Sequence, residues 1–220
     1  VFDCDSTLVS KESLDELILQ KLGTQEELRK KVTRITDQGM AGELSFTDSI
    51  NKRLELFPLE KKDLVAFSQD LQQWLSAGMK ELVSALQQAN VDVWILSGAP
   101  TELLLSLGAQ LGIPSNQIRG VKLSWQKDGR LLGVDRSALS LPSKLHMAEN
   151  LRSDWAEPVI MAGDGYTDLE LFQQGCVNHF IAYTEHKKRP AVMENLGKQR
   201  HANNSKALKH HMGELLGFSL

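Results

Sequence analysis

The stretch Val1-Phe2-Asp3-Cys4-Asp5-Ser6-Thr7 opens the sequence with two apolar residues followed by two aspartates two positions apart. The apolar pair is typical of the tail of a β-strand, and we expect that earlier residues of this strand have been trimmed away. Residues 10–75 then repeat apolar side chains at three- and four-residue steps, as amphipathic helices do. We therefore predict that a first strand ends at Asp3 and that a helical segment is inserted directly after it.

From residue 78 onward the pattern alternates between helices and short apolar runs. Helical spacing covers 79–88, 101–111 and 144–151, and strand-like runs cover 91–96 and 158–162. This alternation is the rhythm of βαβ units, which form a parallel sheet with helices on both faces. Residues 121–134 predict a hairpin that turns at Asp128-Gly129.

The predicted fold is therefore α/β, with a Rossmann-like parallel-sheet core, helices on both of its faces, and an inserted small helical cap domain. The core domain is expected to comprise residues 1–9 and 76–220. The cap domain is expected to comprise residues 10–75 and to cover the carboxyl edge of the sheet.

Composition excludes several classes of function. The chain has 220 residues, 41% of them hydrophobic, and its 25 Lys and Arg against 28 Asp and Glu give a net charge of −3. Such a chain can fold around a packed core, and its scattered basic residues argue against a nucleic-acid partner. The nearest approach to a basic run, Lys187-Lys188-Arg189, is interpreted as the solvated start of a helix.

The sequence also bears on compartment. No apolar run reaches the 18 residues or so that a membrane-spanning helix needs, so we expect no membrane association. Cys4 and Cys176 are too few for a disulfide framework, which favours a reducing, cytoplasmic location.

The two N-terminal aspartates carry the first candidate chemistry. Asp3 and Asp5 leave the predicted sheet at the carboxyl end of a strand, where open α/β sheets bind ligands. One carboxylate can attack phosphorus, and a second can protonate the leaving oxygen and later take a proton from water. Paired aspartates also occur in ordinary turns, where they bond nearby backbone.

The stretch Gly163-Asp164-Gly165-Tyr166-Thr167-Asp168 also follows an apolar run and precedes a helix. Mg²⁺ prefers a few carboxylates together with substrate oxygens and water. Asp164 is a candidate ligand beside Asp3. Asp168, one helical turn later, is better placed to orient the metal ligands without binding the ion itself. An aspartate at this junction could also be a simple helix cap, but the flanking glycines favour close approach to a ligand.

Two further elements complete a phosphoryl-transfer site. Ser97-Gly98-Ala99 offers a hydroxyl and backbone N–H groups before a helix, and Lys144 offers an ammonium group at the start of another. Either would be unremarkable alone, as a turn or a surface lysine. The four elements together indicate transfer of a phosphoryl group.

These four elements, in this order, resemble the motifs of the haloacid dehalogenase superfamily of phosphatases. Over nearly its whole length the chain is similar to the phosphoserine phosphatase family within it. The resemblance implies that Asp3 is the nucleophile and Asp5 the acid and base. It implies that Mg²⁺ is held by Asp3, the backbone carbonyl of Asp5, and Asp164.

The resemblance also implies which residues bind the substrate. Ser97 and Lys144 would hold the phosphoryl oxygens, Gly98 and Thr167 would contribute beside them, and Asp168 matches the last acidic position of the fourth motif. Glu12 would receive the ammonium group of L-phosphoserine and Arg53 its carboxylate, a charge pairing suited to a zwitterion. Met40 and Phe46 would line the apolar part of the pocket.

Other readings stay open. The same fold could serve a phosphatase or phosphotransferase acting on another small ester, such as phosphohomoserine or phosphocholine. A non-catalytic receiver-like module also clusters aspartates, a hydroxyl and a lysine around Mg²⁺, but it needs neither the helical insertion nor the second aspartate. The tail histidines His201, His210 and His211 are interpreted as helix surface without ligand-like partners. The expected partner is a small phosphoester, and the oligomeric state is left open.

Overall fold

The structure is a computed structural model that describes residues 1–135 and 143–220. Its helices are α1 (Ser13–Leu22), α2 (Glu26–Met40), α3 (Phe46–Leu54), α4 (Lys61–Asp70), α5 (Met79–Gln88), α6 (Thr101–Gln110), α7 (Lys144–Leu151), α8 (Tyr166–Gln173), α9 (Pro190–Asn195) and α10 (Ser205–Leu216). Its strands are β1 (Ile95–Pro100), β2 (Ile118–Val121), β3 (Leu123–Trp125), β4 (Leu131–Val134), β5 (Ile160–Gly163), β6 (His179–Tyr183) and β7 (Arg200–Ala202). Short 3₁₀ turns cover Leu71–Trp74, Ser115–Gln117 and Arg152–Asp154, and a tight π-type turn covers Cys4–Leu8.

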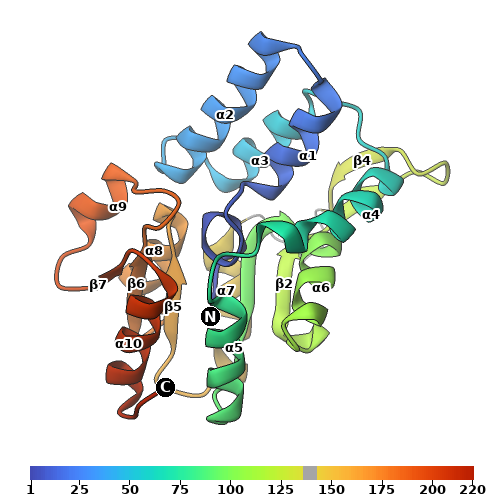
Figure 1. Cartoon of the computed structure of the whole chain (residues 1–220). Helices are drawn as coiled ribbons and strands as arrows, with labels where there is room; N and C mark the ends of the chain where they lie inside the picture. Colours follow the sequence, from blue (N-terminus) through green and yellow to red (C-terminus); the bar gives the residue numbers. More distant parts are fainter. Residues whose placement is uncertain (136–142) are drawn as a thin grey trace.

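A parallel sheet forms the centre of the molecule (Figure 1), and the N-terminal segment joins its two halves. On one side β1 pairs with β2, and on the other β5 pairs with β6 and β6 with β7, all in parallel. Phe2 bridges Ile95 of β1 and Ala162 of β5. Its backbone N–H donates to the carbonyl of Trp94 at 2.8 Å, and its carbonyl accepts from the N–H of Leu96 at 3.0 Å.

Side chains of the sheet contribute alternately to two apolar layers, one on each face, because successive residues of a strand point to opposite faces. Ile95 and Ile181 belong to one buried cluster, which also contains apolar residues of α5, α6 and α10. Leu96 and Phe180 belong to the other, which contains residues of α7 and α8. A parallel sheet is stable only when both faces are covered in this way. The predicted α/β fold class is therefore confirmed.

The inserted segment is helical, as its spacing predicts. Helices α1, α2 and α3 lie together at the top of the molecule in Figure 1, whereas α4 packs against α6 beside the sheet. The chain leaves and returns at neighbouring points, because the N–H of Ser10 donates to the carbonyl of Trp74 and that of Ser76 to the carbonyl of Leu8, both at 2.8 Å. A hinge at this boundary would need such side-by-side connections. The division at residues 10–75 itself stays a prediction.

Several element bounds differ from the sequence prediction. The strand predicted at 91–96 is β1, Ile95–Pro100, because its partner β2 begins opposite Ile95 and ends opposite Pro100. Ser97 and Gly98 therefore lie inside a strand instead of in a turn. The first strand is reduced to the single bridging residue Phe2. The predicted hairpin is present as β3 and β4, but Val121 belongs to β2.

Phe2 is 1% exposed and belongs to a buried apolar cluster that includes residues from both halves of the sheet. This position leads to a prediction about stability. Phe2→Ala is expected to lower the free energy of unfolding by about 3–5 kcal/mol, through lost burial and the cavity left behind. Urea unfolding measures this loss. Phe218→Ala, at a side chain 40% exposed, serves as the control with an expected loss of no more than about 1 kcal/mol. Equal losses in the two variants would contradict the linking role of Phe2.

Candidate active site

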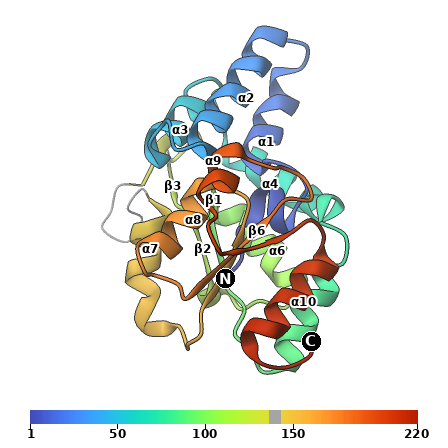
Figure 2. The same ribbon diagram turned by 90° about the vertical axis from the view of Figure 1, so that its left-hand side faces the viewer.

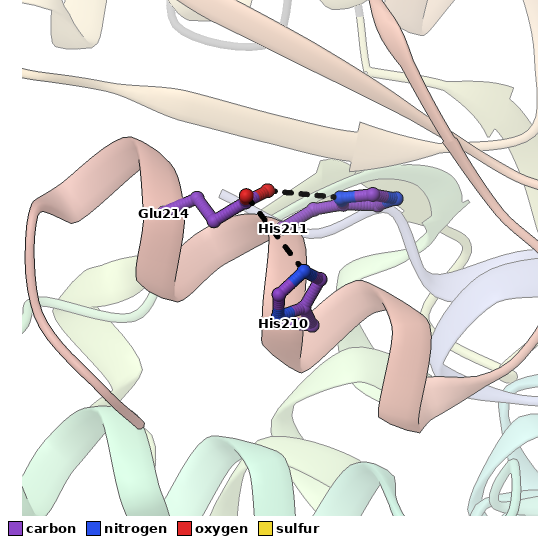
Figure 3. Close-up of side chains that lie close together, drawn as sticks. All are labelled: His210, His211 and Glu214. Carbon is purple, nitrogen blue, oxygen red and sulfur yellow. Dashed lines mark hydrogen bonds and ion pairs between the residues drawn. The ribbon is translucent and has the colours of Figure 1, made fainter.

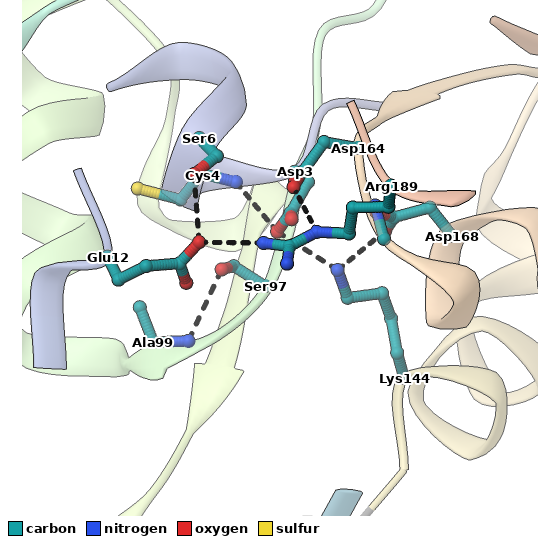
Figure 4. A network of polar contacts seen from close by, with 11 residues as sticks. Asp3, Cys4, Ser6, Glu12, Ser97, Ala99, Lys144, Asp164, Asp168 and Arg189 are labelled. Atoms are coloured by element: carbon teal, nitrogen blue, oxygen red, sulfur yellow. Dashed lines mark hydrogen bonds and ion pairs between the residues drawn. The ribbon is translucent and has the colours of Figure 1, made fainter. Parts of the chain in front are cut away.

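The carboxyl edge of the sheet gathers the polar residues that the sequence singles out (Figure 4). Asp3 follows the bridging residue, Ser97 lies in β1, Asp164 follows β5, and Lys144 is the first residue of α7. All four side chains are buried, with exposed fractions of 1–2%. Parallel strands end at one edge of a sheet, so four positions that lie far apart in the sequence, from Asp3 to Asp164, meet at one point.

Lys144 is the cation at the centre of this cluster. Its Nζ lies 2.9 Å from Asp3 Oδ1 and donates to Asp168 Oδ1 at 2.6 Å. Burial alone would lower the pKa of Lys144, but the carboxylates of Asp168 and Asp3 outweigh it, and the pKa lies above its ordinary value. The ammonium group therefore stays charged and holds Asp3 beside it.

The tight turn after Asp3 carries Asp5. Asp3 Oδ1 accepts from the N–H of Cys4 at 2.8 Å, and Ser6 takes a φ of 52°, which few residues other than glycine adopt. Burial raises the pKa of Asp5 well above its usual range, and the negative charges of Glu12 and Asp3 raise it further. A raised pKa favours the protonated form of Asp5, which is the form a general acid needs.

Three carboxylates are arranged as a cation site. Oxygen atoms of Asp3, Asp164 and Asp168 lie within 4.8 Å of one another. Asp168 already accepts from Lys144 and, at 3.0 Å, from the N–H of Gly165. Asp164 Oδ1, in contrast, is buried without a partner among the described residues. Hard oxygen donors of this kind suit Mg²⁺, so the residues fit that ion, with Asp3 and Asp164 as ligands and Asp168 as their support.

A narrow cavity of about 40 Å³ opens beside Asp3 and Asp5. The structure brings to its wall every substrate-binding residue that the sequence predicts: Glu12, Met40, Phe46, Arg53, Ser97, Gly98, Lys144 and Thr167. Gly98 has a steric reason, because a Cβ there would lie 2.9 Å from Cε2 of Phe46. The Ser97 hydroxyl accepts from the N–H of Ala99 at 3.2 Å.

The two charged residues expected to recognise a zwitterion already have partners. Glu12 Oε1 accepts from the hydroxyl of Ser6 at 2.8 Å, while Glu12 Oε2 is buried with no partner in the described part of the chain. Arg53 donates through Nη1 to Asp15 Oδ1 at 2.9 Å and through Nε to the carbonyl of Ser49 at 3.2 Å. Sequence reasoning missed Asp15, which has no motif of its own.

Comparison with known proteins gives this site a family. The sequence profile of the haloacid dehalogenase-like hydrolases matches residues 1–173. The phosphoserine phosphatase of Rattus norvegicus is 30% identical over 172 residues, which are 77% of this chain and 74% of that protein. This chain belongs to the phosphoserine phosphatase family of the haloacid dehalogenase-like hydrolases.

Two further relatives of this family member are similar over most of its length. The chloroplastic phosphoserine phosphatase of Arabidopsis thaliana is 31% identical over 197 residues, or 88% of this chain, which spans 65% of that relative's length. The crystal structure of a phosphoserine phosphohydrolase-like protein from Francisella tularensis superimposes with a TM-score of 0.90 and 36% identity. The match covers 96% of this chain and 97% of that one.

Arg189 of this hydrolase corrects one sequence interpretation. Lys187 and Lys188 are exposed, as expected of a solvated helix start, but Arg189 beside them is buried. Its Nε donates to Asp164 Oδ2 at 2.6 Å and its Nη2 to Glu12 Oε1 at 2.9 Å (Figure 4). The one local indication that Arg189 does not belong to the solvated helix start was Pro190. A proline favours extended backbone at the residue before it, which places Arg189 outside the helix.

The interpretation of the tail histidines as helix surface holds for His210 and His211, whose side chains are exposed or partly exposed on α10, but not for His201. His201 lies in β7 instead of on a helix, and His210 and His211 of α10 face the carboxylate of Glu214 (Figure 3). The nearest oxygens of Glu214 are 3.7 Å from His210 Nε2 and 3.5 Å from His211 Nδ1. Arg200 Nη1 donates to the same carboxylate at 2.6 Å and neutralises its charge. His210, His211 and Glu214 therefore form a polar surface cluster together with Arg200.

In the described part of this hydrolase, no helix combines the length and the apolar character needed to cross a membrane.

The buried ion pairs of Lys144 generate a testable prediction. Lys144→Met removes the cation from between Asp3 and Asp168 and is expected to lower the free energy of unfolding by about 3 kcal/mol, because unpaired buried carboxylates are costly. Urea unfolding of metal-free protein gives the measurement. Lys80→Met changes an exposed lysine of α5 and should shift stability by about 0.5 kcal/mol or less. Coincident unfolding curves for the two variants would show that the pairs contribute nothing.

Proposed function

We propose that this chain is a Mg²⁺-dependent phosphoserine phosphatase, which hydrolyses L-phosphoserine to serine and phosphate through an aspartyl-phosphate on Asp3. The observation that carries the proposal is the cavity in which Asp3 and Asp5 face Glu12 and Arg53. A carboxylate and a guanidinium group beside the reacting carboxylate can match the ammonium and carboxylate groups of phosphoserine. Membership of the family supports the same substrate.

The proposed reaction has two steps. Asp3 attacks phosphorus in line, and the Lys144 ammonium group, 2.9 Å from Asp3 Oδ1, holds the attacking side chain in position. Asp5, whose raised pKa favours its protonated form, gives its proton to the serine oxygen as that bond breaks. The ionised Asp5 then takes a proton from water, which attacks the phosphorus of the acyl phosphate and frees Asp3.

The phosphoryl oxygens need positive or hydrogen-bonding groups around them. Lys144, the Ser97 hydroxyl and the residues Gly98 and Thr167 line the cavity at the point where these oxygens would lie. Mg²⁺ on Asp3 and Asp164, with the backbone carbonyl of Asp5 as a further ligand, would supply charge neutralisation of the transferring group. Asp168 keeps both Lys144 and the Gly165 loop in place for this role.

Substrate choice is assigned to the helical segment. Glu12 Oε2, buried without a partner among the described residues, is directed to the ammonium group. Arg53, held by Asp15, pairs with the carboxylate, while Met40 and Phe46 enclose the apolar part of the serine. The helical segment would close over the bound ester to exclude water and open to release serine. Serine biosynthesis in the cytoplasm is the corresponding cellular role.

One observation keeps a second substrate class in view. Glu12 and Arg53 are each neutralised by another residue, Arg189 and Asp15. A pocket with paired charges could also accept a differently spaced ester, such as phosphohomoserine or phosphocholine. This alternative keeps the reaction and changes only the substrate.

A substrate panel tests the proposal. Phosphate release from L-phosphoserine should exceed release from phosphocholine and a sugar phosphate by at least about tenfold, since these esters lack one or both charged groups of the amino acid and each lost pairing is worth more than about 1.4 kcal/mol. It should also exceed release from phosphothreonine and phosphohomoserine, which keep both charges but carry one more carbon atom than the narrow cavity is expected to accept. Chelation with EDTA and the variant Asp3→Asn should each abolish turnover. Preference for another ester would overturn the substrate assignment, and Mg²⁺-independent turnover would overturn the metal assignment.

The proton-donor role of Asp5 is tested by the leaving group. Asp5→Asn should slow phosphoserine hydrolysis by about 10²–10⁴-fold, the usual contribution of a general acid and base. With p-nitrophenyl phosphate, whose leaving group needs no proton, the first step should survive and the second should fail. Rapid-quench measurements should then show one equivalent of nitrophenolate and a trapped phosphoenzyme. Equal slowing of the first step for both esters would exclude this role.

A further inference from the structure

A large open groove runs outside the closed cavity, between α2 and the segment that leads into α9. It has a volume of about 740 Å³ and is lined on one side by Arg34 and Asp37 of α2 and on the other by Lys187, Lys188 and Arg189. Figure 2 shows α9 beside the lower end of α2. The mechanism uses none of the groove's exposed residues.

Helix α2 separates the groove from the cavity. Thr36 and Met40 line the cavity, whereas Asp37 and Gln38, on the other side of the same turns, line the groove. Arg189 completes this wall. Its Nη2 donates to Glu12 on the cavity side at 2.9 Å, and its Nη1 lies 3.5 Å from Asp37 on the groove side.

We infer that the groove is the entrance for a phosphate monoester dianion, and that the contacts of Arg189 with Glu12 and Asp37 are the gate between groove and cavity. This inference rests on the proposed phosphatase function. It adds a route, the ligand charge that the route favours, and the contacts that must break for passage.

The charge of the groove supports an anionic ligand. Lys30 is already paired with Glu26, within 3.7 Å. Arg34, Lys187 and Lys188 are exposed and form no ion pair within residues 1–135 and 143–220. A concave surface with excess positive charge raises the local concentration of an anion and its association rate, most strongly at low ionic strength.

The gate follows from where each partner of Arg189 belongs. Asp164, at 2.6 Å, follows β5 of the sheet, as Arg189 itself follows β6, so this contact can persist when the helices move. Glu12 and Asp37 belong to the inserted segment, and they would leave Arg189 when α1 and α2 move away from the sheet. The guanidinium group would then face the groove with unpaired N–H donors, which an incoming phosphate can accept.

The entrance is tested by charge reversal in the groove. Lys187→Glu with Lys188→Glu should lower kcat/KM about tenfold at low ionic strength, and the loss should shrink to less than about twofold near 0.5 M salt, because salt screens exposed charges. The ester is whichever of the panel the unmodified enzyme hydrolyses fastest. Lys80→Glu with Lys206→Glu makes the same change of net charge on α5 and α10 and should leave kcat/KM unchanged. Equal losses in both pairs, or a loss that ignores salt, would overturn the entrance.

The gate is tested without substrate. Asp37→Asn weakens one exposed contact of Arg189 and should speed amide hydrogen exchange in residues 184–191 and at the end of α2 by about two- to fivefold, the effect of one exposed ion pair. Glu27→Gln, at another exposed acid of α2, should leave exchange in these segments unchanged. Unchanged exchange in Asp37→Asn would overturn the gate. Because this readout needs no turnover, a protein that hydrolyses no ester would refute the proposed function without deciding the gate.

Discussion

Burial of negative charge is the constraint on which the rest of this structure depends. Asp3, Asp5, Asp164 and Asp168 are buried at one edge of the sheet and Glu12 is nearly so. Apart from the Arg53–Asp15 pair, two cations among the described residues face them, Lys144 and Arg189. Charges taken out of water are tolerated only when they are paired, protonated or bound to a metal. Buried acidic side chains therefore outnumber the buried cations at this edge. The raised pKa of Asp5, the position of Lys144 between two carboxylates, and the fit of a divalent cation to Asp3 and Asp164 each reduce this excess of negative charge.

The fold follows from the sequence to the extent that local pattern determines it. The helices at 79–88 and 144–151 lie where their spacing predicts, because each has a clear apolar face and a defined start. Asp3 and Asp164 follow strands, Ser97 lies in one and Lys144 begins a helix, and these residues converge because parallel strands share an edge. Strand β1 begins and ends later than the predicted run at 91–96, because the bounds of a strand depend on the strand it pairs with. Its partner begins at Ile118, too far along the chain for the local pattern to reveal.

What the sequence could not predict are the partners of the charged residues. Arg53 pairs with Asp15 across 38 positions, and Arg189 pairs with Glu12 across 177. No periodicity or motif links residues at such separations, and a lysine-rich context makes Arg189 look solvated. These pairs are products of tertiary packing, and they fix in advance the orientation of side chains that a flexible arginine or glutamate would otherwise lose entropy to adopt.

The side-by-side connections at Ser10 and Ser76 have a consequence for how such enzymes diversify. The inserted segment leaves and rejoins the core at neighbouring points. An inserted segment of another length or another internal structure would therefore require little adjustment of the sheet. The entropic cost of closing a longer excursion grows only slowly with the number of residues in it. Any compact unit whose ends meet could be grafted at this junction, so the residues at the sheet edge can be inherited unchanged while the segment above them is replaced.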